Sequence, residues 1–160
     1  MKPYQLEFQQ NLPISVSEAW DFFSSPVNLA KITPKEMAFT ITSNPEHIKS
    51  MYPGTIITYK VSPIWGIQLD WMTEITQVEH EKYFIDEQRF GPYKFWHHQH
   101  HFKAIEGGTE MTDILTYGLP MGIFGRIANR IFVADKLQQI FEFRKQKVME
   151  LFGDYPSTGT

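Results

Sequence analysis

The chain has 160 residues, a length that suits a single domain able to bury a sizeable apolar core. It contains no cysteine, which excludes disulfide scaffolds, thiol catalysis and cysteine-type zinc sites. The formal net charge of −3 gives no basic surplus for binding nucleic acid, and the aromatic content of 15% favours strands and apolar pockets.

The N-terminal segment predicts one strand and two short helices. Apolar and polar residues alternate over residues 4–12, as in a half-buried strand. Ser15 and Glu18 then have the spacing of a capping box, which starts a helix. We expect this helix to end near Pro26 and a second one to cover residues 27–32, ending at Thr33-Pro34 because the residue before a proline disfavours the helical conformation.

Strand patterns dominate the middle of the chain. Gly, Pro and Asn residues separate them into short segments joined by connections too short for parallel crossovers, so we expect an antiparallel sheet. The predicted strands after the helices cover residues 38–42, 55–61, 67–78, 82–90, a histidine-rich segment that follows Gly91-Pro92, and residues 109–119.

A long helix is predicted at the C-terminal end. Residues 126–152 contain no glycine or proline, and a helix of that length extends about 40 Å, enough to cross the whole sheet. Its apolar residues at the helical period predict the face that contacts the sheet: Ile127, Ile131, Ala134, Phe141, Val148 and Phe152. We expect one domain over residues 1–153 and a flexible tail over residues 154–160.

The apolar segment at residues 121–125, Met-Gly-Ile-Phe-Gly, precedes this helix. Exposed apolar residues between glycines are costly unless they cover something. We therefore predict a mobile loop that closes a cavity, with Met121, Ile123 and Phe124 moving as a ligand enters.

The histidine-rich segment carries the candidate chemistry. Successive strand residues point to opposite faces, so Trp96, His98, His100 and Phe102 share one face. If a turn over residues 105–108 joins this strand to the next, Ala104 pairs with Thr109. The same register places His100 opposite Asp113, Phe102 opposite Met111, His98 opposite Leu115 and Trp96 opposite Tyr117. A turn at Gly107-Gly108 would shift the pairing by two residues and keep the same face.

Two interpretations of His98, His100 and Asp113 remain open from the sequence. The carboxylate could orient an imidazole toward a ligand carbonyl or hydroxyl, or these groups could satisfy one another inside a structural wall. A metal site of two histidines and Asp113 is a third reading, but the sequence offers no clear further ligand. We expect no metal and no cofactor.

The chain resembles the START/Bet v 1-like superfamily, also called SRPBCC. The resemblance covers nearly the whole chain and rests on the segment from Leu12 to Phe23, on Asn28-Leu-Ala-Lys-Ile-Thr-Pro, on the pattern from Gly91-Pro-Tyr to Phe102, and on Met111-Thr-Asp and Tyr117-Gly-Leu-Pro. These motifs are similar to those of a bacterial polyketide cyclase/dehydrase-like subgroup. The fold implied is an α+β helix-grip, in which a curved antiparallel sheet of about six to seven strands wraps the long C-terminal helix.

The resemblance implies binding of a hydrophobic small molecule, such as a lipid, isoprenoid, quinone or polyketide-like aromatic, between sheet and helix. A cyclase or dehydratase using His98, His100 and Asp113 is one alternative, and a co-chaperone-like interaction module is another. We expect a cytoplasmic monomer or weak homodimer without stable membrane insertion, since no apolar run approaches the length of a membrane span. The predicted ligand-binding residues are Trp71, Trp96, His98, His100, Phe102, Met111, Asp113, Leu115, Tyr117, Met121, Phe124 and Phe141.

Overall fold

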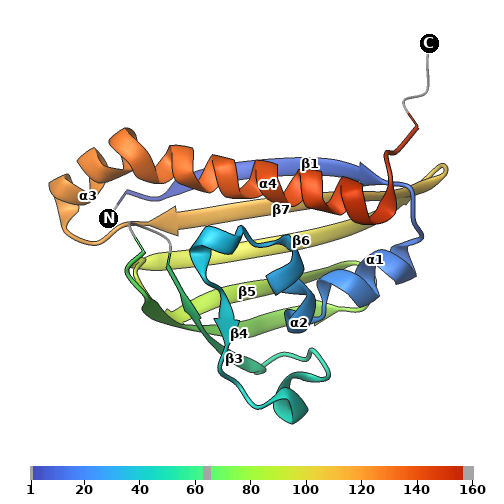
Figure 1. The fold of residues 1–160 in the computed structure, drawn as a ribbon, viewed down its shortest axis with the longest axis horizontal. Coiled ribbons are helices and arrows are strands. Elements are labelled where there is room, and N and C mark those ends of the chain that lie inside the picture. The colour runs from blue at the N-terminus through green and yellow to red at the C-terminus, as the bar shows by residue number, and fades with distance from the viewer. Residues whose placement is uncertain (1, 63–65, 157–160) are drawn as a thin grey trace.

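Antiparallel strands form a single curved sheet in the computed structural model, which describes residues 2–62 and 66–156 (Figure 1). The spatial order of the seven strands found there is β1-β7-β6-β5-β4-β3-β2, so the first strand lies beside the last. The strands are β1 (Tyr4–Leu12), β2 (Thr40–Ile41), β3 (Ile56–Val61), β4 (Leu69–Glu79), β5 (Tyr83–Phe90), β6 (Phe95–Ile105) and β7 (Gly108–Gly118).

Two short helices follow β1, as the sequence predicts. Helix α1 (Val16–Phe23) begins with the expected capping box: the Glu18 backbone N–H donates to Ser15 Oγ at 3.2 Å, and the Ser15 N–H donates to Glu18 Oε2 at 3.0 Å. Helix α2 (Pro26–Leu29) continues into the 3₁₀ turn η1 (Ala30–Ile32), which ends before Thr33-Pro34. Two further 3₁₀ turns, η2 (Lys35–Met37) and η3 (Pro45–Ile48), precede β3.

The C-terminal helix crosses the sheet as predicted but begins earlier. It runs without a break through α3 (Gly122–Ala128), the π-helical turn η4 (Asn129–Val133) and α4 (Ala134–Phe152). The prediction of a loop over residues 121–125 is therefore wrong from Gly122 onward, where the chain is helical. Gly125 has a packing role here, because a Cβ on it would lie 2.1 Å from the Pro120 carbonyl oxygen.

The predicted apolar stripe is correct only in the second half of this helix. Phe141 and Val148 are buried, whereas Ile127 and Ile131 are half or more exposed. The π-helical turn between these two halves adds a residue to the turn and rotates the earlier side chains around the axis. Gly125, Asn129 and Val133 face the protein interior in their place.

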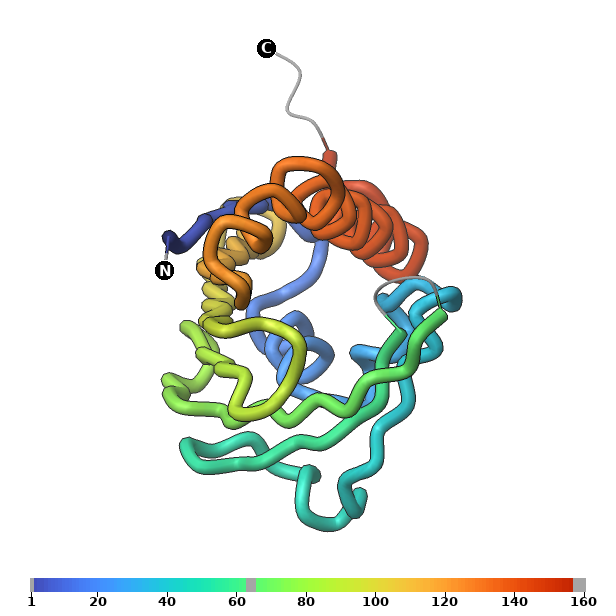
Figure 2. The backbone as a smooth tube through the Cα atoms, turned by 90° about the vertical axis from the view of Figure 1, so that its left-hand side faces the viewer, coloured from blue at the N-terminus to red at the C-terminus, as the bar shows by residue number. Residues whose placement is uncertain are grey.

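Sheet, short helices and C-terminal helix together enclose the interior, as the view along the sheet shows (Figure 2). At one end Trp20 of α1 packs edge-on against Phe84 and Phe102, with ring centroids 6.0 and 5.7 Å away. No helix in the described ranges is long and apolar enough to cross a membrane. Of the predicted tail, residues 157–160 lie outside the described residues, while the Tyr155 hydroxyl donates to the Glu106 carbonyl oxygen at the β6–β7 turn.

Candidate functional site

The inner face of β6 carries the residues predicted from the alternation. His98, His100 and Phe102 are buried and Trp96 is half-buried. The β6–β7 register also matches the prediction: His100 pairs with Asp113, His98 with Leu115 and Ala104 with Thr109. The turn itself consists of Glu106 and Gly107, and Gly107 has the positive φ of 75° that such tight turns require.

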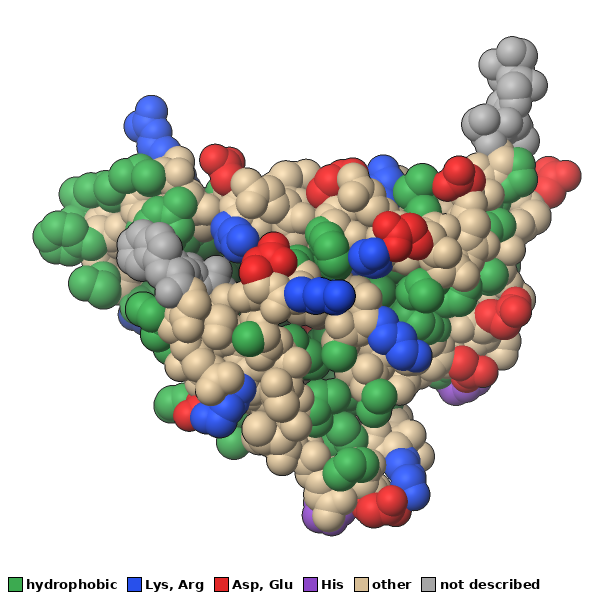
Figure 3. Space-filling model, viewed as in Figure 1, with side chains coloured by type: hydrophobic (Ala, Val, Ile, Leu, Met, Phe, Trp, Pro, Cys, Tyr) green, Lys and Arg blue, Asp and Glu red, His purple; other side chains and the backbone are tan. Residues whose placement is uncertain are grey.

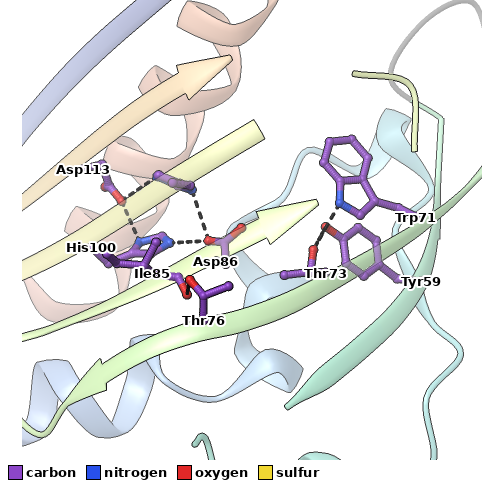
Figure 4. A network of polar contacts seen from close by, with 9 residues as sticks. Tyr59, Trp71, Thr73, Thr76, Ile85, Asp86, His100 and Asp113 are labelled. Carbon is purple, nitrogen blue, oxygen red and sulfur yellow. Dashed lines mark hydrogen bonds and ion pairs between the residues drawn. The ribbon is translucent and has the colours of Figure 1, made fainter. Parts of the chain in front are cut away.

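A second carboxylate, missed in the sequence, joins this face from β5. Asp86 pairs with His98 across the sheet, and its Oδ2 lies 2.9 Å from His100 Nε2 and 3.5 Å from His98 Nδ1 (Figure 4). The contact with His100 has hydrogen-bond geometry. Asp86 therefore reaches one nitrogen of each imidazole ring.

Asp113 reaches the other nitrogen of each ring from β7. Its Oδ1 lies 2.7 Å from His100 Nδ1 and 3.0 Å from His98 Nε2. Both distances suit ion pairs, but neither contact has the angles of a hydrogen bond, and these three buried atoms have no other hydrogen-bond partner among the described residues. The two ring centroids are only 3.9 Å apart, so Asp86, His98, His100 and Asp113 form one compact cluster, called here the Asp–His cluster.

Burial and neighbouring charges set the protonation of the Asp–His cluster. Burial opposes charge on His100, but Asp113 and Asp86 outweigh it and raise the pKa of this imidazole to about 9. Burial and the adjacent His100 charge lower the pKa of His98. Burial raises the pKa of each aspartate, yet the histidines outweigh it and hold both values below the ordinary range. With no ion bound, the cluster at neutral pH contains two carboxylates, one imidazolium at His100 and one neutral imidazole at His98.

Arg144 adds a positive charge from the opposite wall, on α4. Its Cζ lies 5.0 Å from the centroid of the Phe141 ring, and its charge helps to lower the pKa of Asp86. The Nε atom is buried and has no hydrogen-bond partner among the described residues. This donor can therefore serve an acceptor that the described chain does not supply.

Three neutral polar side chains on β3 and β4, those of Tyr59, Trp71 and Thr73, lie beside the Asp–His cluster (Figure 4). Thr73 Oγ1 accepts a hydrogen bond from Trp71 Nε1 at 3.1 Å and contacts the Tyr59 hydroxyl at the same distance. Burial raises the pKa of the Tyr59 hydroxyl well above its usual value, so Tyr59 stays neutral.

Two pockets between the sheet and the C-terminal helix border these polar groups. The first has a volume of about 140 Å³ and is lined by Asp86, His98 and His100 together with apolar residues such as Ile57 and Phe84. The second has a volume of about 110 Å³ and is lined mainly by aromatic and aliphatic side chains, including Trp71, Tyr93 and Phe141. They form adjoining lobes of one cavity, since both are lined by Leu29, Phe39, Tyr59, Trp96, His98 and Arg144.

The predicted ligand-binding residues separate into four groups, of which the last, Met121 and Phe124, lies on the surface. Trp71, Trp96, His98, His100 and Phe141 line the two lobes. Asp113 and Met111 border a different hollow of about 230 Å³ between β1 and α4, and Phe102, Leu115 and Tyr117 are packed in the core.

Met121 and Phe124 lie away from both lobes. They are 75% and 67% exposed at the start of the C-terminal helix, where apolar side chains gather on the surface (Figure 3). Ile123, Ile127 and Ile131 are also exposed there. The closing movement predicted for this segment stays a prediction.

The sequence also missed Arg144, Tyr59 and Tyr93 as cavity residues. Arg144 follows Phe141 by three positions, which places both on neighbouring parts of one helix face, and this spacing was a usable signal. Donor atoms of Asp86, His98 and His100 all lie within 4.8 Å of one another, so within residues 2–62 and 66–156 these three form the group that could hold a metal ion, in place of the predicted set with Asp113.

No family model matches this sequence, and no curated protein matches it. Solved structures do match in fold over nearly the full chain. Protein CV1439 from Chromobacterium violaceum is 7% identical with a TM-score of 0.72, covering 94% of this chain and 98% of that one. Major latex-like protein 151 from Panax ginseng is 10% identical with a TM-score of 0.63, covering 94% and 97%. Ara h 8.0201 is 16% identical with a TM-score of 0.57, covering 93% and 99%.

These structural matches confirm the helix-grip fold, which the sequence predicts. At such low identities they carry information about the fold alone.

Proposed function

We propose that this protein is a cytoplasmic binder of a compact aromatic molecule that carries a polar group, held between the sheet and the C-terminal helix. The observation that carries the proposal is a cavity with aromatic walls that is also lined by Asp86, His98 and His100 of the Asp–His cluster. Binding sites for small molecules typically combine mostly apolar walls with a few fixed polar groups.

The cavity volume favours one part of the ligand classes predicted from the sequence. Each lobe is about 110 to 140 Å³, below the range of about 300–1,000 Å³ typical of pockets for drug-sized ligands. A cavity of roughly 150 Å³ accepts a single benzene-sized ring. A quinone or polyketide-like ring system spanning both lobes therefore fits better than a long-chain lipid or isoprenoid, which would require the C-terminal helix to move outward.

The polar groups favour a ligand with oxygen atoms. Arg144 and the neutral imidazole of His98 both line the two lobes, so a phenol, quinone or carboxylate in the cavity would lie beside both side chains. Trp71, Tyr93 and Trp96 provide ring faces on the other side, with Trp71 and Trp96 packed edge-to-face 5.1 Å apart.

Titration with 2-naphthol, followed by quenching of tryptophan fluorescence, tests the proposal. Leu29 lines both lobes, so Leu29→Trp should fill the cavity and weaken binding at least tenfold. Val27 lies on the same short helix but is 57% exposed, so Val27→Trp is the matched control and should bind as the original protein does. Circular dichroism checks that both variants fold. Equal affinity for all three proteins would place 2-naphthol outside the cavity and refute the proposal.

Catalysis of proton transfer is the second candidate, favoured by the position of His98. Its lowered pKa keeps the ring neutral at pH 7, and it borders both lobes, as a general base of cyclase or dehydratase type requires. In an enzyme, His98→Gln should abolish turnover while ligand affinity changes less than threefold. In a simple binder no candidate substrate is turned over by either protein.

A further inference from the structure

The Asp–His cluster has the donor arrangement of a metal site. Asp86 Oδ2 lies 2.9 Å from His100 Nε2 and 3.5 Å from His98 Nδ1, and the three atoms lie within 4.8 Å of one another. Two nitrogen or oxygen donors that bind one ion at about 2.0–2.2 Å, at an angle of about 90–110°, are themselves about 2.8–3.5 Å apart. The two contacts of Asp86 therefore match the spacing of donors around a single ion.

The far side of both imidazole rings supports the same reading. Histidines that bind a metal through one ring nitrogen usually direct the other ring N–H to a carboxylate or carbonyl, which fixes the orientation of the ring. Asp113 Oδ1 lies at ion-pair distance from both distal nitrogens, 2.7 Å from His100 Nδ1 and 3.0 Å from His98 Nε2, and only a small rotation of the rings would turn these contacts into hydrogen bonds. One aspartate would thus orient both histidines while the other completes the ligand set.

The candidate ion position has an open side. Asp86, His98 and His100 all line the first lobe of the cavity, so water or a ligand can approach the point where their donor atoms converge. A set of three protein ligands with an accessible further position is typical of catalytic, rather than purely structural, metal sites.

We propose that Asp86, His98 and His100 bind one divalent first-row transition-metal ion through Oδ2, Nδ1 and Nε2, with Asp113 as the residue that positions both rings. Two imidazoles and one carboxylate suit ions such as Zn²⁺ and Fe²⁺ better than Mg²⁺ or Ca²⁺, which take oxygen ligands. The two carboxylates balance the charge of the ion, which leaves Arg144 to pair with an anionic group of a ligand. The inference is separate from the small-molecule proposal, because binding of the ion is measured without any organic ligand.

Zinc titration of the full chain tests the proposal. The protein is stripped with EDTA, the chelator is removed, and ZnCl₂ is added in competition with a chromophoric chelator. We expect one ion per chain, at least 100-fold weaker binding in Asp86→Asn, and about 10- to 100-fold weaker binding in Asp113→Asn. A stoichiometry well below one, or unchanged affinity in Asp86→Asn, would overturn the assignment.

Two histidines on the opposite face of β6 provide matched controls. His97 contacts Glu87 at 2.8 Å, and His101 contacts Gln99 at 3.0 Å, both on the outer face of the sheet. His97→Ala and His101→Ala should each bind zinc within threefold of the original protein. A large loss in either one would place the ion on the outer face and contradict the proposal.

The original protein gives a test that does not depend on any variant folding. Loaded with Co²⁺, it should show two strongly shifted, exchangeable imidazole N–H signals in its proton NMR spectrum, one from His98 Nε2 and one from His100 Nδ1. The ion should displace any proton from the ring nitrogens near Asp86, and this proton is released to the solvent. One shifted imidazole signal, or none, would overturn the two-histidine assignment.

Discussion

Replacing Asp113 by alanine tests whether the buried cluster is charged as described. The change removes the carboxylate whose Oδ1 lies 2.7 Å from His100 Nδ1 and leaves a buried imidazolium with Asp86 as its remaining close partner. An imidazole whose pKa rises from 6.5 to about 9 on folding is stabilised by about 3 kcal/mol in its charged form. Removing one partner of a buried ion pair typically costs about 3–5 kcal/mol, because the other charge is left without a partner. Here Asp86 remains beside His100, so the expected cost is somewhat smaller.

We therefore expect Asp113→Ala to lower the free energy of unfolding by about 2–4 kcal/mol at pH 7. The control is Glu110→Ala on the outer face of the same strand, where Glu110 contacts Lys103 at 3.6 Å and the Lys103 side chain is 73% exposed. Exposed pairs of this kind contribute about 0–1 kcal/mol.

Urea unfolding, followed by tryptophan fluorescence and circular dichroism, measures both variants. EDTA is present throughout, so that a bound ion does not change the result. Trp96 is a suitable reporter, because its ring lies 6.2 Å from that of His98. If Asp113→Ala loses no more stability than Glu110→Ala, the cluster does not hold a buried charge pair and the electrostatic argument fails.

Two further predictions concern pH and the start of the C-terminal helix. The folded-state pKa of His100 is raised, so its contribution to the free energy of unfolding is complete below pH 6.5 and is lost as pH rises through about 9. The folded-state pKa of His98 is lowered, so the free energy of unfolding falls as pH drops below 6.5. Urea unfolding of the metal-free protein from pH 4 to 10 should therefore show a maximum near pH 6.5, and a flat profile above it would contradict the raised pKa. Gly125→Ala should lower the unfolding free energy by about 1–3 kcal/mol, because the new Cβ would lie 2.1 Å from the Pro120 carbonyl oxygen; an increased melting temperature, as helix propensity alone would give, would refute this.

Local signals were sufficient for most of the fold and for one side of the site. The capping box at Ser15 and the Glu106-Gly107 turn depend only on neighbouring residues, and both have the expected consequences in the structure. The turn sets the β6–β7 register, so the pairing of His100 with Asp113 could be predicted before any tertiary contact was known.

The start of the C-terminal helix could not be predicted in the same way. Gly125 is typical of a loop in the sequence, but its small size serves a close contact with the Pro120 backbone. The π-helical turn at residues 129–133 changes which side chains face the sheet, and no strong local pattern marks it. Ile127 and Ile131 were therefore assigned to the wrong face.

Asp86 shows why one of the two carboxylates of the Asp–His cluster could not be predicted from the sequence. Its pairing with His98 depends on the β5–β6 register, and the two strands are not joined by a tight turn. Regular pairing ends at Glu87 and His97, and the Gln88 side chain holds the irregular connection together by donating to the Tyr93 carbonyl oxygen at 2.6 Å and accepting from the Tyr93 N–H at 3.2 Å.

The Gln88 side chain thus supports the connection beside a register that no turn rule provides, and that register decides the chemistry available to the site. With Asp113 alone the histidines have one carboxylate partner and no clear further metal ligand, as the sequence indicated. With Asp86 opposite His98, the same rings have a carboxylate on each side, and their proximal nitrogens converge on one point at the edge of the cavity. Loss of the Gln88 contacts in Gln88→Ala should accordingly weaken zinc binding while the β6–β7 pairing is retained.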